Sequence, residues 1–246
     1  MTEAKHKVGT RADWLAARVA LLEREKEHTR RSDELARERR ALPWVPIEKS
    51  YTFETEAGRR TLAELFEGRP QLLVFHLMFG PDDALACEGC SFTADNWAGA
   101  VPHLNYHGVS FVAVSRAPLE KLLPYKQRMG WTFPWVSCFG TDFNLDFSVF
   151  TEQERSTGAG FNFGSGREGI DVREVELHGL SAFALDDGVV YHTYSTYDRG
   201  TDVLTGTWQL LDRAPHGRSG APADWPLRGY EYRERLTSGS SPVGSS

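Results

Sequence analysis

The residues best suited to chemistry are two cysteines, Cys87 and Cys90, in the stretch from Leu72 to Trp97. An apolar run at 72–78 and a Gly-Pro-Asp-Asp turn precede them, and a helical pattern begins where they stand. Unpaired N–H groups at a helix N-terminus favour a thiolate over a thiol. With two residues between them, one sulfur can attack a disulfide and the other can resolve the mixed disulfide. The spacing therefore predicts a redox-active dithiol that uses no cofactor.

The same sulfurs could instead bind a metal ion, because half of a zinc site also has the C-x-x-C pattern. His76 lies at the carboxyl end of the apolar run, and His178 lies before a later strand. Together with Cys87 and Cys90 these histidines would make a Cys₂His₂ set, which suits zinc or copper. The metal site stands as an alternative to the dithiol.

Three further side chains have two interpretations each. His76 shares a strand face with Leu72 and Val74, so it is either a core histidine or a proton relay for the dithiol. Arg116 ends the second apolar strand, the edge of an α/β sheet where ligands bind, and could hold an acidic substrate group or form a salt bridge. Cys138 follows a run of aromatic residues and is either a resolving cysteine or, as we expect, a buried structural thiol.

The elements that must position these residues alternate along the chain. We expect a strand, a helix running from the cysteines to about Tyr106, a second strand, and a second helix that ends at Gly130. Alternation of this kind indicates parallel strands joined by helical crossovers. An Asp-Asp-Gly turn then predicts an antiparallel hairpin, and a last helix follows. The expected strands are 51–54 (an edge strand), 72–78, 109–115, 180–185 and 189–194, and the helices after 42 are 61–66, about 90–106, 118–130 and 202–211.

The N-terminal segment is expected to form one long helix from Asp13 to Leu42, with Thr10 and Asp13 as a capping box. Its apolar residues form a narrow stripe at seven-residue spacing. The stripe could pack on the same chain or form a homodimer.

The order strand, helix, strand, helix, hairpin, helix is that of the thioredoxin-like fold. The chain also carries long ordered motifs, among them FHLMFGPD at 75–82, CEGCSFTADN at 87–96, FVAVSRAPLEK at 111–121 and HTYSTYDRG at 192–200. With these motifs it resembles the bacterial thioredoxin-like family called domain of unknown function 899. The resemblance implies an α/β fold with a central mixed sheet flanked by helices, and a dithiol–disulfide oxidoreductase that uses Cys87 and Cys90.

Two positions depart from the usual thioredoxin-like pattern. A cis-proline commonly precedes the hairpin strand opposite the dithiol, and His178-Gly179-Leu180 stands there instead. Glu88 lies between the cysteines and, with the acids of the preceding turn, is expected to raise the pKa of a neighbouring thiol.

Composition sets the remaining expectations. The chain has 246 residues, 40% of them apolar, and a net charge of -6 with mixed signs, which disfavours nucleic acid as a partner. No leader-like or membrane-length apolar run is found, and only three cysteines occur, so we expect a cytoplasmic protein with no membrane partner. The expected organisation is a helical arm at 1–46, a thioredoxin-like domain at 47–214 with an insertion at 151–170, and an irregular tail at 215–246.

The sequence thus predicts an oxidoreductase whose partners are a disulfide or oxidised-thiol substrate and an external reductant. A peroxide-reducing variant is a subclass of the same chemistry. The alternatives of other classes are the metal-binding module and a thioredoxin-like scaffold that performs no reaction.

Overall fold

The computed structural model describes residues 7–147, 150–151 and 175–218. The chain separates into two compact units, residues 1–43 and 44–246. Most of the expected insertion at 151–170 and of the expected tail at 215–246 lies outside the described residues.

The first unit is the helix α1, Arg11–Arg40. The predicted capping box is present, because the Thr10 hydroxyl accepts a hydrogen bond from the Asp13 N–H and the Asp13 carboxylate accepts one from the Thr10 N–H. Three arginines in the last turn complement the negative end of the helix dipole. The predicted helix, 13–42, is displaced by two residues from the observed one. No α1 residue is buried, and the side chains of the predicted stripe include the half-exposed Trp14 and Leu21.

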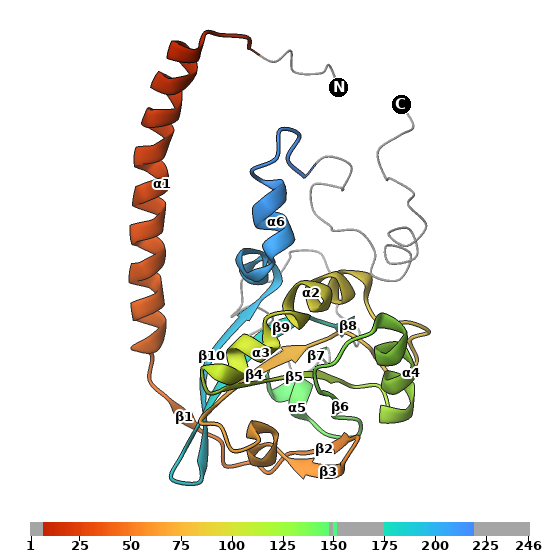
Figure 1. Cartoon of the computed structure of the whole chain (residues 1–246). Helices are drawn as coiled ribbons and strands as arrows, with labels where there is room; N and C mark the ends of the chain where they lie inside the picture. The colour runs from red at the N-terminus through yellow and green to blue at the C-terminus, as the bar shows by residue number, and fades with distance from the viewer. Residues whose placement is uncertain (1–6, 148–149, 152–174, 219–246) are drawn as a thin grey trace. The chain divides into compact units, whose positions relative to one another are not determined.

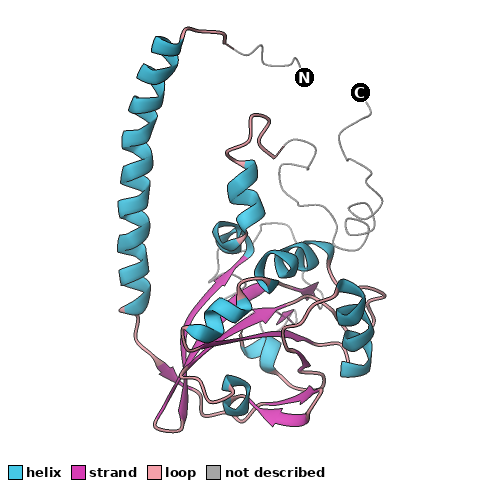
Figure 2. Cartoon of the chain, in the orientation of Figure 1, coloured by secondary structure: helices cyan, strands magenta, loops and turns pink. Residues whose placement is uncertain are grey.

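The second unit is built on one eight-stranded mixed sheet with the order β1-β10-β9-β4-β5-β6-β2-β3 (Figures 1 and 2). Its centre holds the parallel strands β4, β5 and β6, and β9 pairs with β4 in the antiparallel direction. A separate two-stranded ribbon consists of β7 and β8. The strands are β1 (Val45–Pro46), β2 (Thr52–Thr55), β3 (Gly58–Thr61), β4 (Gln71–His76), β5 (Val109–Ser115), β6 (Trp135–Ser137), β7 (Phe150–Thr151), β8 (Val175–Glu176), β9 (Gly179–Asp186) and β10 (Val189–Tyr197).

The core of the sheet has the predicted order of elements. The strand β4 is followed by α2, β5 and α4, and the hairpin β9–β10 and the short helix α6 come later in the chain. The hairpin turns at Asp187 and Gly188, both with positive φ, as the predicted Asp-Gly turn requires. The helices after α1 are η1 (Ala63–Phe66), α2 (Glu88–Ala98), α3 (Val101–Tyr106), α4 (Leu119–Met129), α5 (Phe143–Asp146), η2 (Asp198–Leu204) and α6 (Gly206–Leu211).

Alternation along the central strands gives the sheet two separate cores. Phe75 and Leu77 point to the face that α2, α3 and α4 cover, and Cys90 is buried in that core. Leu72 and Val74 point to the other face, where η1 and α5 pack. The two faces of β4 therefore carry side chains into different environments.

Several boundaries differ from the predicted ones. The helix predicted to reach Tyr106 is interrupted at Gly99 and Ala100, and Pro102 falls in the first turn of α3, where a missing N–H costs nothing. The predicted helix at 202–211 is a 3₁₀ segment, η2, followed by α6. The predicted edge strand at 51–54 is β2, which lies inside the sheet because β3 pairs with its outer side.

Candidate dithiol site

Cys87 is the N-cap residue of α2, at the point where the chain leaves the carboxyl end of β4. Its N–H donates to the Met78 carbonyl at 2.9 Å, which ties the start of the helix to the strand. The Cys87 carbonyl accepts the first hydrogen bond of the helix from the Ser91 N–H at 2.9 Å, and a second one from the Ser91 hydroxyl. Cys87 is partly exposed, Cys90 is buried, and both are free thiols. The predicted placement of the cysteines at a helix start is therefore present.

The surroundings of Cys87 favour its thiolate and lower its pKa to about 7. The largest cause is a hydrogen bond from the Cys90 thiol to the Cys87 sulfur, and the backbone N–H groups of Cys90 and Gly89 add to it. Partial burial acts in the opposite direction. Near neutral pH a large fraction of Cys87 is therefore the nucleophilic thiolate.

Cys90 has the opposite character. Burial and the neighbouring Cys87 sulfur raise its pKa well above the ordinary value, although the Met78 N–H lowers it somewhat. It therefore remains a protonated thiol that donates to Cys87. A partly exposed thiolate in contact with a buried thiol is the arrangement that attack followed by resolution needs.

Glu88 shifts the pKa of Cys87 in the predicted direction, but its contribution is small. Its charge raises the pKa of Cys87, and this is the smallest of the five causes. The hydrogen bonds to the Cys87 sulfur outweigh it, so the net pKa shift is downward. The predicted upward effect of Glu88 on the pKa of Cys87 is therefore present, but it does not decide the net shift.

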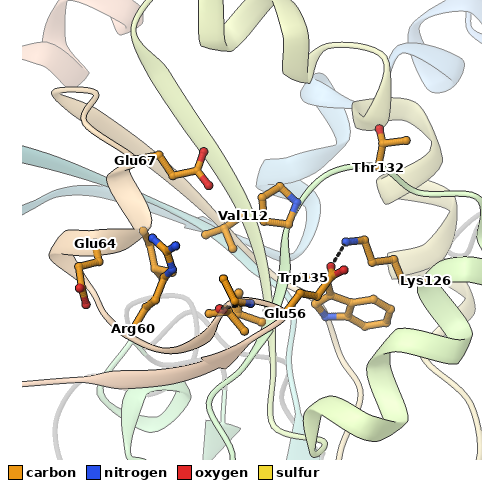
Figure 3. A pocket seen from close by; sticks show the side chains of 13 residues that line it. Glu56, Arg60, Glu64, Glu67, Val112, Lys126, Thr132 and Trp135 are labelled. Carbon is orange, nitrogen blue, oxygen red and sulfur yellow. Dashed lines mark hydrogen bonds and ion pairs between the residues drawn. The ribbon is translucent and has the colours of Figure 1, made fainter.

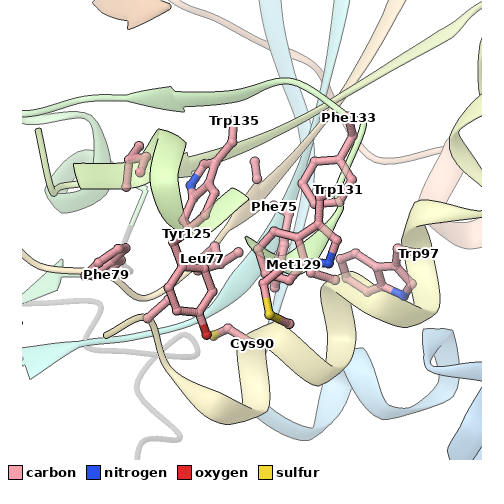
Figure 4. Close-up of a cluster of buried hydrophobic side chains, with 14 of the residues drawn as sticks. Phe75, Leu77, Phe79, Cys90, Trp97, Tyr125, Met129, Trp131, Phe133 and Trp135 are labelled. Atoms are coloured by element: carbon pink, nitrogen blue, oxygen red, sulfur yellow. The ribbon is translucent and has the colours of Figure 1, made fainter. Parts of the chain in front are cut away.

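Two hydroxyls beside the dithiol were not anticipated from the sequence. The Ser91 hydroxyl, which bonds the Cys87 carbonyl, is also 3.0 Å from the Tyr125 hydroxyl. Burial raises the pKa of Tyr125, and the charge of Cys87 adds to this rise. Tyr125 comes from α4 and lies with Cys90 among the aromatic rings of this core (Figure 4). The sequence offered no signal, because Tyr125 sits on an ordinary apolar helix face.

His76 lies on the other face of the sheet from the dithiol. Its ring is buried and is bonded through Nδ1 to the Asn144 side-chain oxygen at 3.2 Å and through Nε2 to the Ser181 hydroxyl at 2.9 Å. It stacks on Phe143, and burial lowers its pKa to about 4. His76 is therefore a satisfied core histidine, and the proton-relay role does not fit this position.

His178 precedes β9, where a proline is usual, and its side chain contacts η2. Its Nε2 lies 3.3 Å from the Asp198 carbonyl and 3.3 Å from the Thr201 hydroxyl. The next residue, Gly179, must be glycine, because a Cβ there would stand 2.5 Å from the Tyr197 ring. The predicted Cys₂His₂ set is thus not assembled, and the described residues hold no group of three or more His, Cys, Asp or Glu able to bind a metal.

Arg116 forms an ion pair whose partner the sequence did not reveal. Its guanidinium donates to Glu176 Oε1 at 2.9 Å, which selects the salt bridge over the anion site among its predicted roles. Glu176 is on β8, and its side chain is only 10% exposed. The charge of Glu176 raises the pKa of both Cys90 and Cys138. Cys138 is fully buried, as predicted, and burial raises its pKa to about 12.

A cavity of about 320 Å³ lies away from the cysteines, between the β2–β3 hairpin and the start of β6 (Figure 3). Val112 and Trp135 line it, and Lys126 forms an ion pair with Glu56 at its side. Its charged groups also include Arg60 and Glu64, and the pKa of Glu64 is lowered mainly by hydrogen bonds from Thr61 and to a smaller extent by the charge of Arg60. The opposite charges of this cavity largely balance one another.

The strand order, the hairpin and the cysteine pair at the first core helix together define a thioredoxin-like protein with a dithiol. The chain belongs to the family described as "Bacterial protein of unknown function (DUF899)", whose model matches residues 3–232. This confirms the family that the sequence motifs indicated. No curated protein matches the chain in sequence.

Solved structures similar to this chain include a protein studied for its alkyl peroxide reduction activity and a peroxidoxin. The bacterioferritin comigratory protein of Xanthomonas campestris is 12% identical, with a TM-score of 0.42, over 66% of this chain and 95% of its own. The peroxidoxin BcpB of Mycobacterium tuberculosis is 15% identical, with a TM-score of 0.41, over 69% and 96%. A hypothetical protein of Sinorhizobium meliloti is 13% identical, with a TM-score of 0.42, over 84% and 90%. Separately, none of the helices in the described ranges has the length and apolar content needed to cross a membrane.

Proposed function

We propose that this protein is a thiol–disulfide oxidoreductase in which Cys87 is the nucleophile and Cys90 the resolving thiol. The observation that carries the proposal is the contact between the two sulfurs at the start of α2, with the exposed one stabilised as a thiolate. Its predicted setting is the cytoplasm, where a reducing environment keeps such a dithiol in its active form.

The proposed reaction has two displacement steps. The Cys87 thiolate attacks one sulfur of a substrate disulfide, a mixed disulfide forms, and the other half of the substrate leaves as a thiol after taking a proton. Cys90 then loses its proton and attacks the Cys87 sulfur, which releases the second half of the substrate. The substrate gains two electrons and two protons, and the protein is left with a Cys87–Cys90 disulfide. An external thiol reductant restores the dithiol.

A peroxide is the oxidant in the variant of this scheme. Cys87 would attack one peroxide oxygen and become a sulfenic acid while an alcohol or water leaves, and Cys90 would condense with the sulfenic acid to release one molecule of water. The end product, a Cys87–Cys90 disulfide, is the same. Oxidants of both kinds therefore belong in the test.

The test compares the wild-type protein with Cys87→Ser, and with Cys138→Ser as the matched control at a thiol outside the pair. Each protein is purified without chelator, its zinc and copper content is measured, and its alkylatable thiols are counted after a disulfide or peroxide oxidant and again after a reductant. Loss of two thiols on oxidation, and their return on reduction, in wild type and Cys138→Ser but not in Cys87→Ser, is the expected result.

Other results would reject the proposal. Stoichiometric zinc or copper with Cys87 and Cys90 protected from alkylation would favour the metal-binding module. Two thiols that neither oxidant removes, in a protein that holds no metal, would leave the non-catalytic scaffold.

A further inference from the structure

The cavity beside the β2–β3 hairpin lies where the central sheet opens. The strand β2 pairs with β6 at a single position, Glu54 with Ser137, before the chain turns into the hairpin. On the opposite edge of β6 the Pro134 carbonyl accepts the Ala113 N–H, so the backbone groups of the next residue, Trp135, are directed toward the gap beside β2. No described residue bonds the Trp135 N–H or carbonyl. Trp135 lines the cavity and is nearly fully buried, and buried backbone groups require a partner, which an occupant of the cavity can supply.

Apolar side chains form much of the cavity wall. Leu65, Val112 and Val136 line it, and each of them is buried in the core on the η1 side of the sheet. The cavity volume is about 320 Å³, at the lower end of the range of about 300–1,000 Å³ that is usual for small-molecule sites. A compact ligand with an apolar body therefore suits this cavity.

Arg60 on β3 is a cation of the cavity that lacks a partner. The neighbouring Arg59, on the opposite side of the strand, donates twice to Glu54 at 3.0 and 2.7 Å. Arg60 is partly buried, and within the described ranges it makes no hydrogen bond and no close ion pair. Guanidinium groups that lose contact with water are normally paired. Because its N–H groups form a planar fork, Arg60 is suited to hold the carboxylate of a ligand.

Two glutamates line the cavity at the same end as Arg60 (Figure 3). Glu64 accepts the Thr61 N–H and hydroxyl through Oε2, at 2.7 and 2.9 Å, and its Oε1 has no hydrogen-bond partner among the described residues. Glu67, which pairs with Arg69, adds a second negative charge. These carboxylates would repel a ligand that is only an anion, and Arg60 would repel one that is only a cation. A ligand that carries both charges close together is attracted by both groups.

The other end of the cavity offers no net charge. Lys126 and Glu56 form an ion pair there, and the Lys126 side chain is only 13% exposed (Figure 3). Each of these two charges is satisfied by the other, so neither attracts a further charged group strongly. The part of a ligand that reaches this end is therefore uncharged.

We propose that this cavity binds a free α-amino acid with an uncharged, apolar side chain. The carboxylate of the amino acid accepts hydrogen bonds from Arg60, and its ammonium group donates to Glu64 Oε1. The apolar side chain lies against Leu65, Val112 and Val136, out of water. Binding forms and breaks no covalent bond. The site is separate from the dithiol and does not depend on the proposed redox function.

The experiment compares three molecules with the same apolar chain by isothermal titration calorimetry at low salt. L-leucine carries both charges, 4-methylpentanoate lacks the ammonium group, and 3-methylbutylamine lacks the carboxylate; L-phenylalanine serves as a second apolar amino acid. The full-length proteins are wild type, Arg60→Gln and Glu64→Gln, with Arg59→Gln as the matched control on the other side of β3. The change Glu64→Gln keeps an oxygen that can accept the Thr61 hydrogen bonds. Urea unfolding confirms that each variant is folded.

We expect wild type to bind L-leucine at one site and to bind both charge-deficient analogues about tenfold or more weakly, because each analogue loses a charge-assisted hydrogen bond and meets a like charge. Arg60→Gln should weaken the binding of leucine by about tenfold or more and strengthen that of the amine, since the repelling cation is gone. Glu64→Gln should weaken the binding of leucine and strengthen that of the acid. Arg59→Gln should match wild type. A residue that only maintained the shape of the cavity would not change the preference between the two analogues.

Three results would overturn the proposal. No saturable binding of leucine or phenylalanine in the millimolar range excludes an amino-acid site. Equal affinities of wild type for leucine and 4-methylpentanoate exclude recognition of the ammonium group by Glu64. Equal loss of leucine binding in Arg59→Gln and Arg60→Gln indicates a general effect of surface charge and not a contact in the cavity.

Discussion

The two faces of the strand β4 present polar groups in opposite ways. On one face the chain passes Phe75 and Leu77 and reaches a dithiol whose outer sulfur is partly exposed and easily ionised. On the other face His76 is buried and bonded at both ring nitrogens, and its pKa is lowered so that it stays neutral. One polar site has a reactive atom at the surface, whereas the other has none.

Complete satisfaction of its hydrogen bonds explains why the histidine side is structural. From His76 Nε2 the bonds continue through Ser181 and Ser195 to His192, with oxygen–oxygen and nitrogen–oxygen separations of 2.9 and 2.7 Å. Each group in this series of hydrogen bonds has a partner inside the protein. A histidine and a serine in contact would suggest catalysis, but burial of Ser181 leaves no room for a substrate. Accessibility therefore separates the two faces more clearly than residue type does.

Removal of the nucleophile and of the histidine in turn tests the difference between the two faces. Cys87→Ser should lower the rate of disulfide reduction by at least about a thousandfold, since the attacking atom is lost. Folding should be little affected, because Cys87 is partly exposed. The measurement is the steady-state reduction of a small disulfide alongside urea unfolding. A variant that kept most of the activity would show that the nucleophile lies elsewhere.

The complementary change, His76→Ala, should act on stability. It leaves a cavity and removes the partners of Asn144 and Ser181, which together should cost about 3 kcal/mol or more of the free energy of unfolding. The folded fraction should still reduce disulfides at the wild-type rate, because the ring is on the opposite face from the dithiol. Urea titration and activity per folded molecule test both parts, and a loss of activity without loss of stability would contradict the assignment.

The response of stability to acid should also distinguish the two faces. The pKa of His76 is about 4 in the folded protein and near 6.5 when unfolded. Above pH 6.5 the imidazole is neutral in both the folded and the unfolded protein. Between pH 6.5 and 4 only the unfolded protein takes up the proton. As the pH is lowered through this range, His76 therefore reduces the free energy of unfolding by about 3 kcal/mol. When the free energy of unfolding from urea titrations is plotted against pH, the curves of wild type and His76→Gln should differ most in slope across this range. Parallel curves for the two proteins would show that His76 titrates normally.

The sequence predicted the dithiol face far better than it predicted what surrounds it. An apolar run, a Gly-Pro turn and C-x-x-C are local signals, and they correctly placed Cys87 at the start of α2. The face of His76 was also readable from alternation with Leu72 and Val74, although its two partners come from α5 and β9, distant in sequence. The short strands β1 and β6 gave no periodic pattern of useful length.

Glu176 shows why the remaining part could not be predicted. It follows a polar, glycine-rich stretch and pairs with Arg116, sixty residues earlier, through tertiary structure alone. A glutamate in such a stretch normally suggests a solvated surface. Only burial and the unpaired Oε2 reveal it, and neither property is encoded in a local pattern.

The Cys90 thiol lowers the pKa of Cys87, and its removal should give a smaller effect than the changes above. The hydrogen bond from Cys90 is the largest cause of the low pKa of Cys87, so Cys90→Ala should move that pKa upward from about 7. The rate of alkylation of Cys87 by iodoacetamide, followed against pH, reports the change. Cys138→Ala is the matched control, because that thiol is buried in the opposite core. An unchanged profile in Cys90→Ala would show that the helix start alone sets the pKa.

The smallest expected effect concerns the acidic residue between the cysteines. Glu88 raises the pKa of Cys87 only through its charge, as the weakest of the five causes, so Glu88→Gln should lower that pKa by less than Cys90→Ala raises it. The interaction passes partly through solvent, so added salt should shrink the difference between Glu88→Gln and wild type. Added salt should leave the pKa shift of Cys87 in Cys90→Ala nearly unchanged, because that shift comes from the loss of a direct contact with a buried thiol. If Glu88→Gln gave the larger shift, the charge between the cysteines and not the contact of their sulfurs would control the reactivity of this face.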